Sequence, residues 1–215
     1  MFVTLEGPEG AGKSSVASGL EAALRADGHF VLLTREPGSG HLGMKIRSLL
    51  LESENVAAKS EVFLFLADRA SHVEELVRPA LEQGQVVLCD RYIDSTIVYQ
   101  GHARGFELSR LREWNTFATD GLLPDLTLLL DVPVVVGLGR LQSKDRLDLE
   151  PVEFHERVRS GFLSEAARDP ERWVVINADR PLEMVLADCL DVARKRLAVL
   201  QRPTRDMSSA DSRSN

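Results

Sequence analysis

Several features that define particular classes of protein are scarce in this sequence of 215 residues. It has only two cysteines, Cys89 and Cys189, whose separation fits neither a metal site nor a disulfide framework, and we expect Cys89 to be a buried apolar residue. No apolar run approaches the roughly 18 residues of a transmembrane helix, and the first residues lack the basic region of a secretory signal. These absences argue against a membrane protein or a secreted disulfide protein and favour a cytoplasmic setting.

An excess of basic residues is also missing. The 26 Lys and Arg residues against 33 Asp and Glu residues give a net charge of −7, so nothing global indicates a nucleic-acid partner. A phosphate-rich ligand must then be attracted by a local basic cluster. The hydrophobic fraction of 44% suffices for a full core, and the length suits one domain, expected to span residues 1–201. Residues 202–215 are rich in Ser, Arg and Asp and are expected to form a disordered tail.

Short apolar segments alternate with segments of helical periodicity. Buried strands are expected at Phe2–Leu5, Phe30–Leu33, Val86–Cys89, Leu126–Leu130 and Trp173–Ile176. Helices are expected at Ser14–Arg25, Leu42–Leu51, Ser60–Glu82 with a kink near Pro79, Leu108–Thr119, Val134–Leu141, Val152–Ala167 and Pro181–Leu200. This alternation is typical of right-handed βαβ units, and it predicts an α/β fold with a five-stranded parallel sheet flanked by helices.

The turn after the first strand has the composition of a phosphate-binding loop (P-loop). Residues Gly7–Ser14 fit the pattern Gly-x-x-x-x-Gly-Lys-Ser/Thr and lie between a strand and a helix, as the motif requires. We expect Lys13 to reach the β- and γ-phosphates of ATP and Ser14 to ligate Mg²⁺, in a fold of the P-loop NTP hydrolase type. The loop residues assigned to ATP are Gly7, Pro8, Glu9, Gly10, Ala11, Gly12, Lys13, Ser14 and Ser15.

Three classes of P-loop protein compete for this sequence. A GTPase is disfavoured because an Asn-Lys-x-Asp motif is missing. An ATPase that acts on a macromolecule would carry an acidic pair after an apolar strand, but here Asp90 is followed by Arg91. A small nucleotide kinase needs cations for an acceptor phosphate, and Arg35 and Arg91 follow strands at the edge where ligands of parallel sheets bind. Arg69 lies within a helix, where a solvated face with local ion pairs explains it equally well.

Four segments of the chain resemble the thymidylate kinase family. Residues 88–101 resemble its Asp-Arg-Tyr/His-x-x-Ser-x-x-Ala-Tyr/Phe-Gln motif, and residues 34–38 read Thr-Arg-Glu-Pro-Gly as in its loop. Residues 65–69 resemble its Phe-x-Ala-x-Arg segment, and residues 124–132 its Pro-Asp-Leu and Leu-Asp-Val strand. The resemblance runs from Met1 to about Leu200 and implies the reaction dTMP + ATP → dTDP + ADP. It also suggests a homodimer, as does the long apolar helix at Val62–Leu81.

The resemblance implies a dTMP site made of Glu36, Arg47, Phe65, Arg69, Arg91, Ser95, Thr96, Tyr99 and Gln100. Phe65 would stack on thymine, although its apolar neighbours alone would make it a core residue. Arg69 would bind the carbonyl edge of the base, and Thr96 and Gln100 would read the rest of that edge.

The sugar and phosphate of dTMP have their own implied partners. Tyr99 would fill the space beside C2′, and Glu9 would hold the region of the 3′-hydroxyl. Arg91 and Arg47 would bind the phosphate, with Glu36 acting nearby through water or a second arginine.

The implied catalytic residues are Lys13, Arg91, Arg146, Glu9 and Asp90. Asp90 would belong to the Mg²⁺ site with Ser14 or would orient Arg91, and a strand-end acid paired with an arginine explains it equally well.

One departure from some family members concerns the catalytic cation. Those members carry an arginine in the P-loop where this chain has Gly10, so the cation is expected in a short lid at about residues 140–149. Arg140, Lys144 and Arg146 are the candidates: Arg140 is assigned to ATP and Arg146 to the transferring phosphoryl group. The remaining alternatives are another P-loop deoxynucleotide or deoxynucleoside kinase and an ATPase with a macromolecular partner.

Overall fold

The computed structural model describes residues 1–53 and 55–201. The expected disordered tail, residues 202–215, lies outside this part of the chain. Within the described residues, no helix combines the length and the apolar composition that crossing a membrane would require.

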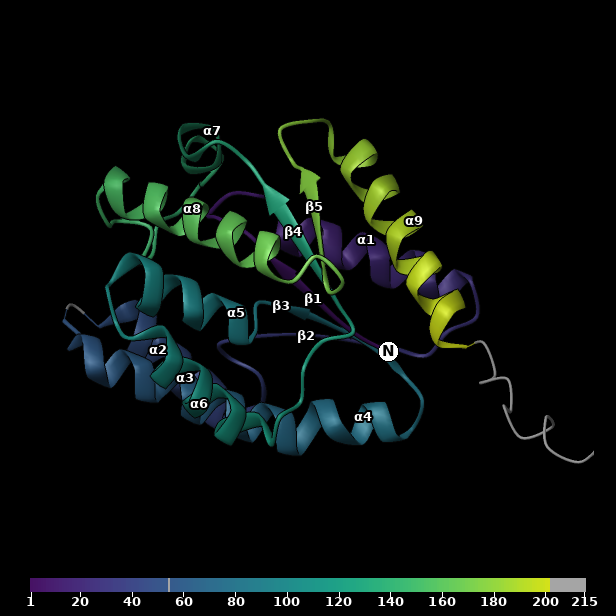
Figure 1. Ribbon diagram of the computed structural model, residues 1–215, viewed down its shortest axis with the longest axis horizontal. Helices are drawn as coiled ribbons and strands as arrows, with labels where there is room; N and C mark the ends of the chain where they lie inside the picture. The colour runs from purple at the N-terminus through teal and green to yellow at the C-terminus, as the bar shows by residue number, and fades with distance from the viewer. Residues whose placement is uncertain (54, 202–215) are drawn as a thin grey trace, which may run out of the picture.

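A parallel β-sheet forms the centre of the molecule (Figure 1). In the described residues it has five strands, which are β1 (Phe2–Glu6), β2 (Val31–Arg35), β3 (Val86–Asp90), β4 (Leu126–Asp131) and β5 (Trp173–Asn177). Their order is β2-β3-β1-β4-β5, and every neighbouring pair is parallel. The α/β fold and the five-stranded parallel sheet expected from the sequence are thereby confirmed.

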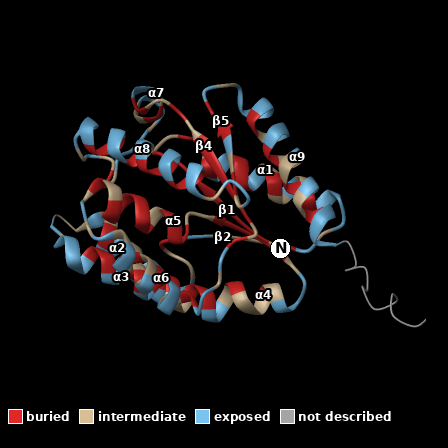
Figure 2. Ribbon diagram, viewed as in Figure 1, coloured by how far each residue is buried: buried red, intermediate tan, exposed pale blue. Residues whose placement is uncertain are grey.

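Helices cover both faces of the sheet, which explains why its strands are largely apolar (Figure 2). One face packs against α1 (Lys13–Ala26) and α9 (Leu182–Leu200). The other face packs against α8 (Val152–Arg168) and against α4 (Arg78–Glu82) together with residues 73–77, which precede α4. Successive strand residues point to opposite faces: Leu88 joins the first core, whereas Val87 and Cys89 join the second.

The long helix expected at Ser60–Glu82 is interrupted by a change of hydrogen-bonding pattern. It consists of α3 (Ala58–His72), a π-helical segment η1 (Val73–Val77), and α4. The irregularity lies just before Pro79, whose ring nitrogen cannot donate to the preceding turn.

The remaining helices are α2 (Gly40–Glu52), α5 (Ile93–Thr96), η2 (a π-helical segment, Ile97–Ala103), α6 (Leu108–Thr119) and α7 (Val134–Gly139). The α5–η2 segment was not expected from the sequence. Its buried face mixes apolar side chains with Asp94, Thr96 and Gln100, so the segment lacks a clear amphipathic period.

Candidate active site

A cavity of about 690 Å³ lies at the carboxyl ends of β1 and β3. The register of the sheet brings these ends together, because Leu5 of β1 and Arg35 of β2 both pair with Asp90 of β3. Nearly all of the site residues expected from the sequence line this cavity; the exceptions are Gly7, Pro8, Arg146 and the exposed lid candidate Lys144.

The P-loop runs from the end of β1 to the start of α1 and is packed closely against α7. A Cβ atom placed on Gly10 would lie 1.9 Å from the carbonyl oxygen of Gly137, and Gly10 has a φ of +67°. No side chain fits at this position while α7 holds its place. The structure thus gives a physical reason for a glycine at the position where some family members carry an arginine.

Lys13 is almost completely buried beneath the P-loop. Its Nζ donates to the carbonyl oxygens of Gly7 and Pro8, at 3.0 and 2.9 Å. Burial lowers the pKa of Lys13 to about 8, with a further contribution from the positive charge of Arg91. Phosphate oxygens placed beside this ammonium group would reverse that effect.

Ser14 and Asp90 form a pair between α1 and the end of β3. The hydroxyl of Ser14 donates to Asp90 Oδ2 at 2.7 Å. Both residues supply the hard oxygen ligands that Mg²⁺ prefers, and both line the cavity. The described residues hold no cluster of three or more His, Cys, Asp or Glu side chains arranged for a metal, so phosphate and water oxygens would complete the ion's coordination.

Glu9 joins the P-loop to the opposite wall of the cavity. Its carboxylate accepts from Arg91 Nη2 at 2.8 Å and from the Tyr99 hydroxyl at 2.6 Å. Burial alone would raise the pKa of Glu9, but the charges of Arg91 and Lys13 outweigh it and lower the pKa to about 2. Arg91 therefore pairs with Glu9 in this structure and not with the strand-end acid Asp90.

The backbone turn that carries Arg91 is held by Glu6, which the sequence analysis did not single out. Arg91 has a φ of +71°, a conformation that costs energy for a residue with a Cβ. The buried carboxylate of Glu6 accepts from the Tyr92 amide at 2.8 Å and from the Ser95 hydroxyl at 2.7 Å. These hydrogen bonds hold the turn in a conformation in which the side chain of Arg91 lines the cavity.

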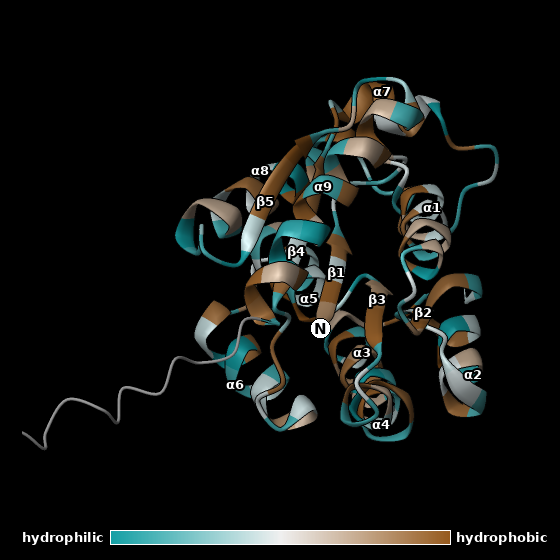
Figure 3. Cartoon of the chain, turned by 90° about the vertical axis from the view of Figure 1, so that its right-hand side faces the viewer, coloured by the Kyte–Doolittle hydropathy of each residue, from teal (hydrophilic) through white to brown (hydrophobic). Residues whose placement is uncertain are grey.

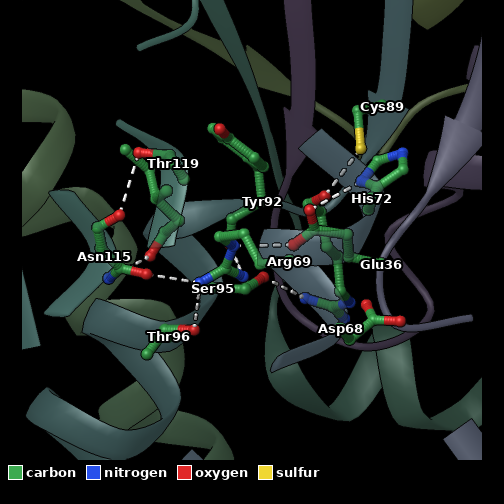
Figure 4. Close-up of polar contacts among 12 residues, drawn as sticks. Glu36, Asp68, Arg69, His72, Cys89, Tyr92, Ser95, Thr96, Asn115 and Thr119 are labelled. Carbon is green, nitrogen blue, oxygen red and sulfur yellow. Dashed lines mark hydrogen bonds and ion pairs between the residues drawn. The ribbon is translucent and has the colours of Figure 1, made fainter. Parts of the chain in front are cut away.

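Arg69 is the centre of a buried polar network (Figure 4). It is 1% exposed, and among the described residues it makes four side-chain hydrogen bonds. The acceptors are Glu36 Oε2 at 2.8 Å, Thr96 Oγ1 at 2.9 Å, the carbonyl oxygen of Tyr92 at 2.9 Å, and Asn115 Oδ1. The interpretation of Arg69 as part of a solvated helix face is therefore wrong. A guanidinium carries five N–H donors, so one on Nη2 stays available to a ligand.

Glu36 belongs to the same network. Its second oxygen accepts from His72 Nδ1 at 2.8 Å, so both carboxylate oxygens are already bonded inside the protein. The family resemblance implied that Glu36 acts through water or a second arginine, and Arg69 is the arginine bonded to it. Arg47 reaches the neighbouring loop instead, where Nη1 donates to the Pro37 carbonyl oxygen at 2.8 Å.

Phe65 is half-buried and lines the cavity, so it is not a residue of the closed core. The nearby Phe63 is 56% exposed on the outside of α3, where its ring packs on Trp114 with 5.4 Å between centroids. Phe65 therefore lines the cavity, whereas Phe63 lies on the outer surface of α3.

The basic residues of the expected lid separate into two groups. Arg140 lines the cavity and donates to the Ala178 carbonyl oxygen at 3.1 Å. Arg146 lies outside the cavity, with Nε donating to the Leu50 carbonyl oxygen at 2.9 Å and Nη2 paired with Glu61. The expectation that Arg146 faces the transferring phosphoryl group is not met in this conformation, because a buried carboxylate holds the side chain elsewhere.

Arg180 is a cavity cation that the sequence analysis missed. It lies three residues beyond the end of β5, so the rule that ligands bind beyond strand ends would have indicated it. His72 and Asn115 carried no comparable signal, since each is a single polar residue on an otherwise ordinary helix.

Comparison with known proteins agrees with this geometry. The family model described as thymidylate kinase matches residues 5–189. The chain belongs to the thymidylate kinase family.

Two relatives named thymidylate kinase illustrate the similarity. The protein from Desulfovibrio desulfuricans is 52% identical over 201 residues, covering 88% of this chain and 93% of its own length. The protein from Thermomicrobium roseum is 51% identical over 188 residues, covering 86% and 90%. The crystal structure of thymidylate kinase from Ehrlichia chaffeensis superposes with a TM-score of 0.76 at 33% identity and covers 90% of this chain and 98% of that one.

Proposed function

We propose that this cavity carries out the reaction of the family, the transfer of the γ-phosphoryl group of ATP to dTMP, giving dTDP and ADP. The observation that carries the proposal is the bridge from Glu9 of the P-loop to Arg91 and Tyr99. It joins a donor site to an acceptor site within one cavity, as a phosphoryl transfer between two bound nucleotides requires.

On the donor side, the P-loop amides and Lys13 would bind the phosphates of ATP. Mg²⁺ would be held by Ser14 and Asp90 and would supply charge neutralisation at the β- and γ-phosphates. Ser15 and Arg140 also line the cavity and would contact ATP.

On the acceptor side, Arg91 and Arg47 would bind the dTMP phosphate. This phosphate is already anionic near neutral pH, so the acceptor needs no general base. Phe65 would stack on thymine, and the free N–H of Arg69 would donate to a carbonyl oxygen of the base. Thr96, which accepts from Arg69, and Gln100, which lines the same cavity, would read the rest of that edge.

Of the three basic residues in the lid, Arg140 and Arg146 are the candidates assigned to the phosphates. Arg140 already lines the cavity, whereas Arg146 would reach the phosphates only after leaving Glu61. Closure of residues 140–149 over ATP would exclude water and limit its hydrolysis.

The test is an ADP-release assay with a panel of acceptors: dTMP, dUMP, dCMP, dGMP, thymidine and no acceptor. We expect ADP release to depend on an acceptor and to be fastest with dTMP. Preference for another nucleotide or for thymidine would identify a different kinase. ADP release without any acceptor would indicate an ATPase that acts on a macromolecule.

We also propose a cytoplasmic homodimer. Both cysteines are free and buried, as suits a reducing compartment. Figure 3 shows hydrophobic segments on α3, and Phe63 of this helix is 56% exposed with its ring against Trp114 of α6, while Phe117 of α6 is 88% exposed. Exposed aromatic residues grouped in this way are typical of a subunit interface.

Sedimentation equilibrium tests the dimer. The wild type is expected at twice the mass of the chain, and the double variant Phe63→Asp, Phe117→Asp at the mass of one chain. Phe30→Asp is the matched control, because Phe30 is 82% exposed but precedes β2 and lies outside α3 and α6. A monomeric wild type, or a monomeric Phe30→Asp variant, would contradict the proposed interface.

A further inference from the structure

A second buried carboxylate, Glu61 on α3, lies behind the acceptor side of the cavity. It is completely buried, and its Oε1 accepts from Gln100 Nε2 at 2.9 Å and from Arg104 Nε at 2.8 Å. Its Oε2 accepts from Arg104 Nη2 at 3.2 Å and from Arg146 Nη2. Burial alone would raise the pKa of Glu61, but the hydrogen bonds from Arg104 and Arg146 outweigh it, so the group is ionised.

An ionised carboxylate determines how the amide of Gln100 is turned. Such a group accepts hydrogen bonds and cannot donate, so only the NH₂ of Gln100 can face it. The carbonyl oxygen Oε1 of Gln100 must then face away from Glu61. Among the described residues no donor bonds to this oxygen, and it is not sealed from solvent, so it is open to the cavity that Gln100 lines.

Arg104 and Arg146 explain why a carboxylate is needed to orient the amide of Gln100. Arg104 and Arg146 carry only donors, and Arg104 Nε already occupies the same Glu61 oxygen as Gln100. Without the carboxylate, these donors would attract the carbonyl oxygen of Gln100 and turn its NH₂ toward the cavity. Glu61 therefore decides whether the cavity presents an acceptor or a donor at this point.

The cavity then offers one donor and one acceptor among its lining side chains. The donor is the free N–H of Arg69, and the acceptor is Oε1 of Gln100; Thr96, which accepts from Arg69, lies one helical turn before Gln100. A thymine or uracil base presents the complementary pair, the O4 acceptor and the N3–H donor. Cytosine presents the opposite pair, an N4 amine and an unprotonated N3.

We infer that Glu61 is a positioning residue that fixes the amide of Gln100 with its oxygen toward the base, so that the acceptor site selects thymine or uracil over cytosine. This inference rests on the proposed function, because it assigns a role within the same acceptor site. Glu61 does not touch the nucleotide; it acts through Gln100.

The experiment compares dUMP with dCMP, which differ only at N3 and C4 of the base. The ratio of their kcat/KM values, measured on one preparation, does not depend on the fraction of active enzyme. For Glu61→Gln we expect this ratio to fall about tenfold or more, because reversal of one buried hydrogen bond has that size. The ratio of kcat/KM for dTMP to that for dUMP should not change, because these two nucleotides differ only in the methyl group of the base.

Two further variants separate the role of Gln100 from general disruption. Glu150→Gln is the matched control, because Glu150 pairs with Arg104 at 2.8 Å but does not contact Gln100; the ratio should stay at the wild-type value. In a Gln100→Ala background, the effect of Glu61→Gln on the ratio should disappear, as expected for residues acting through one another.

If Glu61→Gln does not fold, Glu61→Asp replaces it. This variant keeps the charge but withdraws the acceptor from Gln100, so a smaller fall in the ratio is expected. An unchanged ratio in the folded Glu61 variant, an equal fall in Glu150→Gln, or a persistent effect in the Gln100→Ala background would overturn the inference. A wild type that phosphorylates none of dTMP, dUMP and dCMP would instead contradict the proposed function.

Discussion

The donor and acceptor sides of the cavity are built in different ways. The donor side is a single stretch of chain, residues 7–14, in which backbone groups surround the buried ammonium of Lys13. The acceptor side joins side chains far apart in sequence, and Arg69 alone bonds to residues 36, 92, 96 and 115. A phosphate can be bound by backbone amides, whereas a base edge must be read by oriented side-chain donors and acceptors.

This difference changes what a substitution costs. Among the described residues, the side chain of Lys13 bonds only to carbonyl oxygens of its own loop, so its loss removes little from the core. Arg69 neutralises the buried Glu36 and joins α3 to α5 and α6, so its loss leaves a buried charge without its cation. We expect variants on the donor side to lose catalysis and variants in the Arg69 network to lose stability.

The largest expected effect is on the donor side. Lys13→Ala should lower kcat by roughly a thousandfold, because a cation at the transferring phosphoryl group is lost. Its free energy of unfolding should change little, as measured by urea titration. Lys45→Ala, an exposed lysine of α2, is the control and should keep wild-type turnover. Near-normal turnover of Lys13→Ala would rule out the donor-site assignment.

The next effect is on the acceptor side. Arg69→Met should lower the free energy of unfolding by about 3 kcal/mol, because Glu36 stays buried without its arginine. Arg91→Met should cost less, about 2 kcal/mol, because the Arg91–Glu9 pair is 17% exposed and Glu9 keeps its hydrogen bond from Tyr99, while its turnover with dTMP should fall sharply. Urea titration and steady-state assays measure the two effects. Equal losses of unfolding free energy in Arg69→Met and Arg91→Met would contradict the expectation that Arg69 mainly stabilises the fold and Arg91 mainly serves catalysis.

The smallest expected effect is a pH dependence of ATP binding. Burial lowers the pKa of Lys13 to about 8, and bound phosphates favour its charged form. As pH rises through 8, the free protein loses this proton, so ATP affinity should fall by up to about tenfold per pH unit. Near pH 8, binding should take up about half a proton per ATP, measurable by calorimetry in buffers of different ionisation enthalpy.

Lys13→Arg is the control for this pH dependence, because arginine stays charged throughout the range. Its ATP affinity should be constant above pH 8. A wild type whose affinity does not change between pH 7 and 9.5 would show that Lys13 is fully protonated in the free protein.

Much of the fold could be predicted from the sequence because its signals are local. The strands at residues 2–6 and 86–90 are apolar runs next to glycine-rich or charged turns, and their observed bounds differ from the expected ones by one residue. The α5–η2 segment was missed for the opposite reason. Its polar residues Thr96 and Gln100 are buried and bonded to Arg69 and Glu61, so polarity there does not indicate solvent.

Local signals were sufficient to predict the P-loop, the succession of strands and helices along the chain, and the resemblance to the family, because each depends on short stretches of neighbouring residues. The pairing of the charged side chains could be seen only in the folded molecule. Arg69 turned inward to Glu36, and Arg146 turned away from the cavity to Glu61. A long cationic side chain takes the carboxylate that burial brings within reach, and that choice depends on residues distant in sequence.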